Sequence, residues 1–354
     1  MSTCPRKEES VEKDTTVAVD LAKSVFEIAV SRRPGKVCER HRLSRGAVLR
    51  FFAQRPASTV VLEGCGSAHF GAREIGAFGH RVVLLPPQHV RRYRPRNKTD
   101  RADAKALLEA FRNEEIRPVP VKTPAQQQLA ALHRLRSAWL GTRTARINTL
   151  RGLLREQGIV IPVGARHVVP RAGELAGDAE SGLPDCLRFA LSELAREIRE
   201  LERRLAELEG RLEALARQSE LAARLRSVPG IGLLTATALA GFVGDLRRFP
   251  SARHFASYLG LTPRERSSGA IRRLGAISKR GDVYLRMLLI HGARAVLAAA
   301  PQMKQPDRMR TWVMELAARV GHNKATVALA NKLARYAWAV ATRDREFVVH
   351  PAAA

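Results

Sequence analysis

The chain has 354 residues, enough for two or three domains, and 45% of them are hydrophobic, which excludes a disordered basic tail. Its 61 lysines and arginines outnumber 34 acidic residues for a net charge of +27, so we expect a polyanionic partner, nucleic acid before an anionic membrane. No apolar run of 18 residues, no secretory signal and no C-x-x-C pair are present, which predicts a cytosolic protein with no membrane span, zinc finger or disulfide framework.

The first third of the chain alternates short apolar runs with helical segments. The predicted strands are Thr16–Asp20, Val25–Val30, Thr59–Glu63 and Arg81–Leu85, and the predicted helices are Ser44–Gln54, Ser67–Phe78 and Thr99–Arg112. Only four residues separate the first two strands, so we expect these two to be antiparallel. This alternation of strands and helices predicts an α/β layer fold with a mixed sheet at 15–120, after a disordered N-terminus at 1–14.

A regular spacing of apolar residues marks the middle of the chain. Residues 121–170 are basic and read as helical, including Leu129–Leu154. Leucine and isoleucine residues then recur alternately four and three residues apart for about four heptads, and together they form an apolar seam. They are Leu187, Leu191, Leu194, Ile198, Leu201, Leu205, Leu208, Leu212 and Leu215. This seam predicts a coiled coil at 187–215, and the alternative is one long helix packed within a bundle. Residues 171–220 carry a net charge of −4, so we expect 121–225 to be a spacer or oligomerisation arm away from nucleic acid.

After residue 225 the pattern becomes helical and basic. The predicted helices are Thr235–Phe242, Ser251–Leu259, Val283–Ala300 and Arg310–Val340, and Pro263–Arg280 reads as a loop or short hairpin. We therefore expect an all-α domain at 226–340, followed by a tail at 341–354.

Four carboxylates fall where three elements of the first domain can bring them together. Asp20 and Glu63 end strands, and sites in open α/β sheets gather at strand ends. Asp100 and Asp103 lie three residues apart at a helix start and share one face. Two divalent cations about 4 Å apart, held by such oxygens, clamp the attacking and leaving oxygens of a phosphodiester. In a strongly basic protein this predicts Mg²⁺-dependent phosphoryl transfer on nucleic acid.

Each of these features also has a simpler interpretation. Asp20 can cap a turn, Asp100 can be an N-cap, and Asp103 can complement the helix dipole as a first-turn acid. A basic segment precedes the helix, with Arg91, Arg92, Arg94, Arg96 and Lys98 ahead of the acids and Arg101 between them. These cations can hold phosphate oxygens, and the alternative is a solvated basic loop.

Two motifs in the last third suggest phosphate contacts. The run Val228-Pro229-Gly230-Ile231-Gly232 has the form of a helix–hairpin–helix turn, whose glycines, Gly230 and Gly232, let backbone N–H groups approach a phosphate. A plain helix–helix turn is the alternative.

The second motif is a serine–glycine pair, Ser268-Gly269, in a cation-rich loop with Arg264, Arg266, Arg272, Arg273, Lys279 and Arg280. A serine there can be a nucleophile or only a hydrogen-bond donor to phosphate, and no histidine or aspartate base is visible nearby.

Six stretches of the sequence resemble one known family. VDLAKSVFEIAV, VVLEGCGSAHF and NKTDRADAKALLEA look like the N-terminal domain of the DEDD transposases of the insertion sequence 110 type, which include the pilin-gene inverting recombinase. SVPGIGLLTATALAGFVGD, FASYLGLTPRERSSG and RRLGAISKRGDVYLRMLLIHGA look like its C-terminal domain. The resemblance runs from about Thr15 to Val340 and includes the coiled-coil insert between the domains.

The resemblance implies a fold, a reaction and partners. The first domain is expected to be RNase H-like and similar to the resolvase RuvC, with Mg²⁺ or Mn²⁺, as two ions, at Asp20, Glu63, Asp100 and Asp103. The family's nucleophilic serine falls on Ser268, with Ser267 adjacent. Family members excise and insert a mobile element on double-stranded DNA as dimers or tetramers, with the acids of one subunit meeting the serine of another. They also use a structured guide RNA from the element.

Two other functions fit the residues taken by themselves. One is a RuvC-like, metal-dependent, structure-specific endonuclease that uses metal-activated water and makes no covalent link. The other is a non-catalytic nucleic-acid-binding protein that dimerises through its coiled coil. In each case we expect the protein in the bacterial cytosol, associated with the nucleoid.

Overall fold

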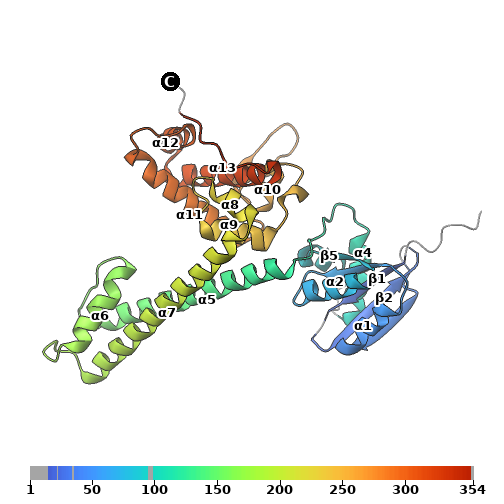
Figure 1. The fold of residues 1–354 in the computed structure, drawn as a ribbon, viewed down its shortest axis with the longest axis horizontal. Coiled ribbons are helices and arrows are strands. Elements are labelled where there is room, and N and C mark those ends of the chain that lie inside the picture. The colour runs from blue at the N-terminus through green and yellow to red at the C-terminus, as the bar shows by residue number, and fades with distance from the viewer. Residues whose placement is uncertain (1–14, 22, 34–35, 95–98, 352–354) are drawn as a thin grey trace, which may run out of the picture. The chain divides into compact units, whose positions relative to one another are not determined.

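The computed structural model describes residues 15–21, 23–33, 36–94 and 99–351, with the side chain of Asp100 excepted. The predicted disordered N-terminus and the candidate cations Arg96 and Lys98 lie outside the described residues. The chain divides into two compact units, Met1–Thr123 and Pro124–Ala354. Figure 1 shows the sheet of the first unit and the helices of the second.

The first unit contains the predicted mixed sheet, which has five strands. They are β1 (Thr16–Asp20), β2 (Val25–Ser31), β3 (Glu39–Ser44), β4 (Thr59–Glu63) and β5 (Arg81–Leu85), in the spatial order β3-β2-β1-β4-β5. The pairs β1–β2 and β2–β3 are antiparallel, while β1–β4 and β4–β5 are parallel. In the described part of this unit, the helical segments are α1 (Arg45–Ala53), α2 (Ala68–Ala77), α3 (Pro87–Val90), η1 (Arg91–Tyr93) and α4 (Asp100–Phe111).

Residues alternate between the two faces of this sheet, and each face has its own core. Val17, Val19 and Ile28 pack with α1 and α2, whereas Ala18, Ala29 and Val61 pack with α4. Because side chains along a strand point to opposite faces in turn, residues two positions from Ala18, Ala29 and Val61 also lie on the α4 face. This alternation places the strand-end acids on the face that α4 covers.

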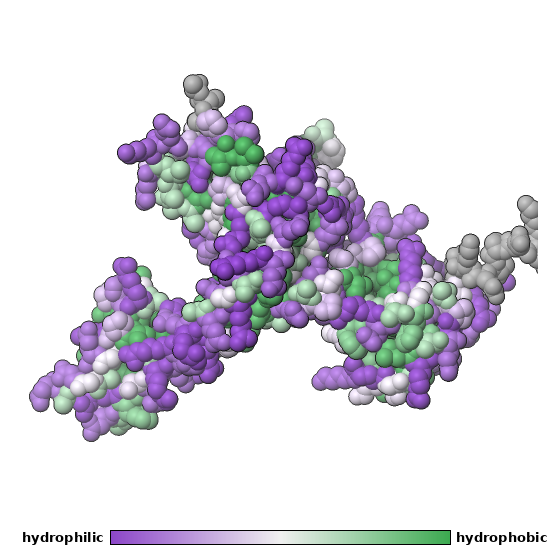
Figure 2. All heavy atoms as spheres, viewed as in Figure 1, coloured by the Kyte–Doolittle hydropathy of each residue, from purple (hydrophilic) through white to green (hydrophobic). Residues whose placement is uncertain are grey.

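The second unit begins with a long helical pair. Helices α5 (Pro124–Arg155) and α7 (Asp185–Arg217) contact each other along their length, with η2 (Ala165–His167) and α6 (Val168–Gly177) between them in the chain. Three ion pairs show that they run antiparallel: Arg136–Glu209, Arg143–Glu202 and Arg146–Glu197. We call α5, α6 and α7 the arm, and hydrophilic side chains cover much of its surface in Figure 2.

Much of the heptad seam packs within its own chain. Leu191, Ile198, Leu205, Leu208 and Leu212 are buried in a single chain. Leu191 and Ile198 share one core cluster with residues of α5 and α6. The buried part of the seam therefore packs against helices of the same chain, whereas four of its leucines are half-buried: Leu187, Leu194, Leu201 and Leu215.

The remaining helices form one core around α11 and α13. They are α8 (Glu220–Arg226), α9 (Leu233–Ala238), η3 (Leu239–Val243), η4 (Leu246–Arg248), α10 (Ala252–Tyr258), α11 (Val283–Ala299), η5 (Ala300–Gln302), α12 (Arg308–Val320) and α13 (His322–Arg343). The predicted segment 310–340 is two helices, because the chain turns at Gly321, whose φ is +88°. The region is mostly helical, as predicted, and its exception is a two-stranded sheet of β6 (Pro263–Glu265) and β7 (Leu274–Ile277).

One helical stretch, Val283–Gln302, is apolar and long enough to cross a membrane by length and composition. It comprises α11 and η5, and 44% of its most apolar 18-residue segment is buried within the protein. Leu285, Leu289 and Ala293 pack in the core beside α13, and Arg286 is buried with them. The stretch is thus a core element of the helical unit.

A buried histidine predicts that this unit loses stability in acid. His133 of α5 is fully buried and hydrogen-bonds the hydroxyls of Tyr284 and Thr237, each at 2.9 Å. Burial, together with the positive charge of Arg136, lowers the pKa of His133 to about 4. The neutral form therefore stabilises the fold fully above pH 6.5, and this contribution is lost as pH falls from 6.5 towards 4.

We expect the free energy of unfolding to fall by about 2 kcal/mol between pH 7 and pH 5 from this group alone. Denaturant titrations of the wild type and of His133→Gln at both values check this. The variant should show a smaller loss between the two pH values, whatever its stability at pH 7. An equal loss in both proteins would assign the acid sensitivity to other groups.

Candidate active site

Two of the four predicted acids end neighbouring parallel strands. In the register of β1 and β4, Val19 lies opposite Leu62, so Asp20 and Glu63 are the next pair along. Both lie on the α4 face of the sheet, two positions after Ala18 and Val61. Burial raises the pKa of the nearby Cys65 thiol, and the negative charges of Glu63 and Asp20 raise it further. The strand ends therefore place Asp20 and Glu63 on one face at the same edge of the sheet.

Helix α4 brings a third acid to the same face. Thr99 caps this helix by accepting a hydrogen bond from the amide of Ala102, and Asp103 follows one turn later with only 4% of its surface exposed. Asp100 occupies the first position of the helix, so its backbone lies one turn from Asp103; its side chain is not among the described parts of the chain.

The guanidinium of Arg94 joins two of these carboxylates. Its Nη2 donates to Glu63 Oε2 at 2.6 Å, and its Nε lies 2.9 Å from Asp103 Oδ1. The second contact is close but misaligned, so Arg94 Nε and Asp103 Oδ1 are both buried without a hydrogen bond. A buried carboxylate oxygen in this state has a lone pair available for a cation.

The donor set suits a hard divalent cation. Carboxylate oxygens are the ligands that Mg²⁺ and Mn²⁺ prefer, and Asp103 supplies one that is buried and without a hydrogen bond. Within the described residues, no three acidic, histidine or cysteine side chains are close enough to share one ion. The Arg94 guanidinium, held between Glu63 and Asp103, accounts for part of this separation. Asp20, Glu63, Asp100 and Asp103 are the residues that would hold the ions.

The contact of Arg94 with the acids gives a testable prediction. Replacing Arg94 with glutamine leaves Glu63 and Asp103 uncompensated, which we expect to cost about 1–3 kcal/mol of unfolding free energy without metal. Because the competing internal cation is gone, Mg²⁺ should bind more tightly and recover most of this loss. Denaturation in EDTA and in Mg²⁺ measures both effects.

Arg91→Gln is the matched control, because Arg91 lies three residues away in the same segment and is exposed. It should change neither stability nor the response to Mg²⁺. If Arg94→Gln behaved like this control, the Arg94 contacts would contribute nothing to the site.

The other predicted cations of this unit are at the surface. Arg91, Arg92 and Arg101 are exposed, and the backbone carbonyl of Arg101 accepts a hydrogen bond from Arg40 at 3.3 Å. Their contact with nucleic acid stays a prediction. Arg94 differs from them, because its charge is already paired with site carboxylates.

The second unit carries the serine loop on an exposed hairpin. Strands β6 and β7 pair antiparallel, and beyond them Ser268 and Ile271 exchange two backbone hydrogen bonds, of 3.3 and 3.2 Å. Gly269 follows Ser268 with φ +57°, the left-handed conformation that this two-residue turn requires at its first central position. Ser268 is thus exposed beside the turn at the tip of the hairpin.

The two adjacent serines differ in their hydrogen bonds. The Ser267 hydroxyl donates to Glu265 at 2.8 Å and accepts from the amide of Arg273 at 3.3 Å. The hydrogen bond from Ser267, with the ion pair to Arg272, holds the pKa of Glu265 below its usual range. The described residues offer no hydrogen-bond partner to the Ser268 hydroxyl, so it is the serine that is available to a substrate.

The base of the hairpin is rigidly anchored. Gly260 and Gly281 have positive φ, and a Cβ on either would lie within 2.0 Å of a carbonyl oxygen of the opposite strand segment. The buried Arg286 donates to the carbonyls of Leu259 and Arg280, each at 3.1 Å. The candidate cations Arg264, Arg266, Arg272, Arg273, Lys279 and Arg280 all lie exposed on this hairpin or at its base.

The two glycines of the predicted helix–hairpin–helix turn have different surroundings. A Cβ on Gly230 would lie 2.9 Å from side-chain atoms of Val296 and Leu333, so this glycine allows close packing against α11 and α13. Gly232 is exposed with open space around it. The packing explains Gly230, and phosphate binding stays a prediction only for the exposed part of the turn.

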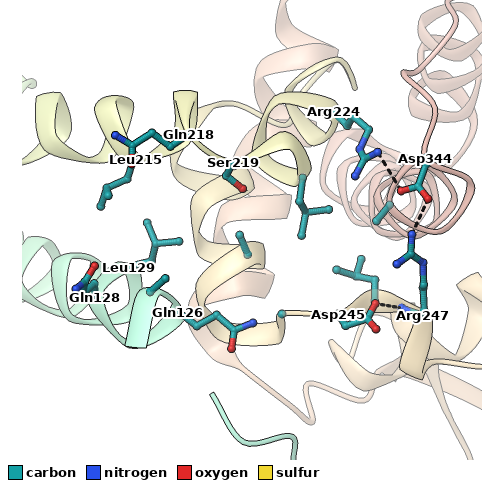
Figure 3. Close-up of a pocket in the computed structure, with 16 residues that line it drawn as sticks. Gln126, Gln128, Leu129, Leu215, Gln218, Ser219, Arg224, Asp245, Arg247 and Asp344 are labelled. Carbon is teal, nitrogen blue, oxygen red and sulfur yellow. Dashed lines mark hydrogen bonds and ion pairs between the residues drawn. The ribbon is translucent and has the colours of Figure 1, made fainter. Parts of the chain in front are cut away.

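A cavity of about 510 Å³ lies where the arm meets the helical core, away from every predicted site residue. Figure 3 shows Asp344 in its wall, bridged to Arg247 at 2.6 Å and to Arg224 at 3.0 Å. Gln126 and Asp245 also line it. These ion pairs join α8, η4 and the end of α13, so the network holds the core together around the start of the arm.

Comparisons with known proteins identify the family. A family model described as Transposase, of the DEDD type of IS110, matches residues 17–158, and a model described as Transposase IS116/IS110/IS902 family matches residues 222–307. The first match contains the four acids, and the second contains the serine hairpin.

Relatives support the same assignment, two of them over nearly the whole length of both chains. A probable family 20 transposase of Pseudomonas aeruginosa is 43% identical over 330 residues, which is 93% of this chain and 97% of that protein. The transposase for insertion sequence element IS1111A of Coxiella burnetii is 36% identical over 342 residues, covering 97% and 93% of the two chains. The pilin gene-inverting protein of Moraxella lacunata is 33% identical over 127 residues, 36% of this chain and 38% of that protein. The mixed sheet is therefore the RNase H-like domain of this family, and the chain belongs to the IS110 family of DEDD transposases.

Proposed function

We propose that this transposase excises and inserts its element by metal-dependent cleavage and rejoining of double-stranded DNA through a covalent link to Ser268. The observation that carries the proposal is the pairing of two features in one chain. One is a set of converging, partly buried carboxylates, and the other is an exposed serine with a free hydroxyl on a cationic hairpin. The acids lie in the first unit and the serine lies in the second.

The chemistry then divides between the two units. Ser268 Oγ forms a bond to the scissile phosphorus, one backbone P–O bond breaks, and the released DNA hydroxyl takes up the proton. A second DNA hydroxyl later attacks the phosphoserine, which frees Ser268 and rejoins the strand. Mg²⁺ or Mn²⁺, as two ions when bound, supplies positive charge at the transferring phosphate. Asp20, Glu63, Asp100 and Asp103 hold that charge, and the hairpin arginines orient the phosphate.

The partners follow from charge and from the family. The net charge of +27 supports binding to DNA and to a structured guide RNA, whose base pairing would select the sequence while the protein reads backbone and shape. We propose a dimer or tetramer in which the acids of one subunit act with Ser268 of another. The copies would associate along the arm, where the seam leucines Leu187, Leu194 and Leu201 are half-buried. This reaction takes place on the DNA of the bacterial cytosol.

Trapping the covalent link tests this proposal. The protein is incubated with Mg²⁺, element-end DNA labelled on one strand and RNA transcribed from the element's own non-coding ends, and it is then denatured. We expect a labelled protein band that depends on Mg²⁺ and disappears after protease treatment. Cleavage of the DNA without any protein-linked band would instead support a RuvC-like endonuclease that uses water. Strand exchange without added RNA would contradict the proposal that a guide RNA selects the DNA sequence.

A further inference from the structure

We infer that Glu27 is a fifth carboxylate of the metal site, positioned on β2 beside Asp20. In the antiparallel pair of β1 and β2, Asp20 and Glu27 lie directly opposite each other. Residues opposite each other in such a pair have side chains on the same face, with Cα atoms about 4.5–5.5 Å apart. Glu27 therefore extends the acid set to a third neighbouring strand. This inference rests on the metal dependence proposed above.

The alternation of the sheet fixes the direction of the Glu27 side chain. Phe26 and Ile28 pack with α1 and α2, while Ala29 packs with α4. Glu27 thus points to the α4 face, the face of Asp20 and Glu63. Across β2, β1 and β4, Glu27, Asp20 and Glu63 form one row beneath α4, which carries Asp103.

The described residues give the largely buried side chain of Glu27 no counter-charge. Only 9% of Glu27 is exposed, yet no hydrogen bond or ion pair to its carboxylate occurs among the described residues. Arg42 lies opposite it on β3, but this arginine is exposed and the two form no ion pair. A carboxylate that is mostly removed from water and receives no counter-charge from the described residues is costly in the folded state. A divalent cation shared with Asp20 removes this cost.

Asp103 gives independent support on the other side of the row. Its Oδ1 is buried without a hydrogen bond, although Arg94 Nε lies 2.9 Å away. Among the described residues, one acid on α4 thus has an unsatisfied oxygen, and one on β2 receives no hydrogen bond. Glu63 is the better compensated of these acids, because Arg94 donates to it. We therefore assign Glu27 to the ion on the β2 side of Asp20, as a direct ligand or through a bound water.

Metal binding by the full chain, without nucleic acid, tests the assignment. Mn²⁺ is titrated into the protein, and the free ion is followed by its electron paramagnetic resonance signal. We expect Glu27→Gln to weaken Mn²⁺ binding about 10- to 100-fold. Glu27→Asp, which keeps the charge, should retain more of the affinity than Glu27→Gln. Glu74→Gln, which removes the same charge from α2 on the opposite face, should bind like the wild type.

Thermal melting separates a metal role from a purely structural one. In EDTA, Glu27→Gln should melt no lower than the wild type, because it removes repulsion from Asp20, and its upward shift on adding Mn²⁺ should be reduced. Wild-type Mn²⁺ affinity in a folded Glu27→Gln protein would overturn the inference, as would a lower melting temperature in EDTA with an unchanged shift. Asp20→Asn is the reference: if it also bound Mn²⁺ like the wild type, the metal site itself would be refuted, and not only the role of Glu27.

Discussion

Replacing Ser268 with alanine is expected to reduce strand exchange by about a thousandfold or more, because no covalent link to DNA can form without its hydroxyl. Ser267 should not substitute for it, since its hydroxyl is held by Glu265 and by the amide of Arg273. Ser268 is exposed, and Gly269 rather than its side chain determines the turn, so the variant should fold and bind DNA normally. The measurements are joined product in a strand-exchange assay and DNA binding at matched salt.

Ser267→Ala is the matched control for this experiment. It removes a hydroxyl one residue away, and Glu265 loses the hydrogen bond from that hydroxyl. We therefore expect strand exchange to fall by about tenfold or less. The nucleophile would be Ser267 if Ser268→Ala recombined at a normal rate and Ser267→Ala showed a severe loss. Normal recombination by both variants would remove serine from the mechanism.

Replacing Asp20 with asparagine is expected to have the second-largest effect, a loss of DNA cleavage of at least about 10²–10³-fold. Asparagine has nearly the same shape but lacks the charge that divalent ions require, and Asp20 lies in the middle of the acid row. The fold should persist, because the apolar residues Val17, Ala18 and Val19 hold β1 in the sheet. Cleavage assays over a range of Mg²⁺ concentrations measure the loss, and raising Mg²⁺ should restore only part of it.

Glu74→Gln removes the same charge from the opposite sheet face and should leave cleavage unchanged. Cleavage by Asp20→Asn at the normal rate and Mg²⁺ dependence would refute the acid site. Together with the serine variants, this experiment distinguishes a defect in binding ions from a defect in attacking the phosphate.

The sequence predicts the strands of the first unit well where they are buried on both faces. The runs TVAVD, TVVLE and RVVLL are short and apolar, and each ends at a carboxylate or before a proline pair, so their type and limits follow from the sequence. The edge strand Glu39–Ser44 has the sequence ERHRLS, and its polar character gives no bounds in advance. The acids were predicted for the same reason as the strands, since Asp20 and Glu63 directly end two of the apolar runs.

The partner of a helix face is harder to predict than the face itself. The heptad leucines of α7 define a seam, but they do not indicate whether another copy or another helix of the same chain covers it. Helix α5 does cover it, although its own apolar positions are interrupted by arginines such as Arg136, Arg143 and Arg146. Those arginines pair with acids of α7, and this charge complementarity was the signal in the sequence that the pair is internal.

The same limit applies within the site. In the sequence Arg94 is one of several neighbouring cations, and only the folded chain distinguishes it as the one that meets Glu63 and Asp103. Glu27 has no motif, because its relation to Asp20 comes from strand register. The roles of Glu265 and Arg286 likewise become visible only in the folded chain. Glu265 accepts a hydrogen bond from Ser267, and Arg286 donates to a carbonyl at the base of the hairpin.

The antiparallel arm has a consequence for how the protein can change in length. Both of its long helices are attached to the core at the same end, where α5 contacts η3 and α7 contacts α8 and α9. Each heptad removed from both helices together shortens the arm by about 10 Å and leaves the seam in phase. The length of the arm can therefore change in steps of one heptad without any change in the part of the protein that carries the serine.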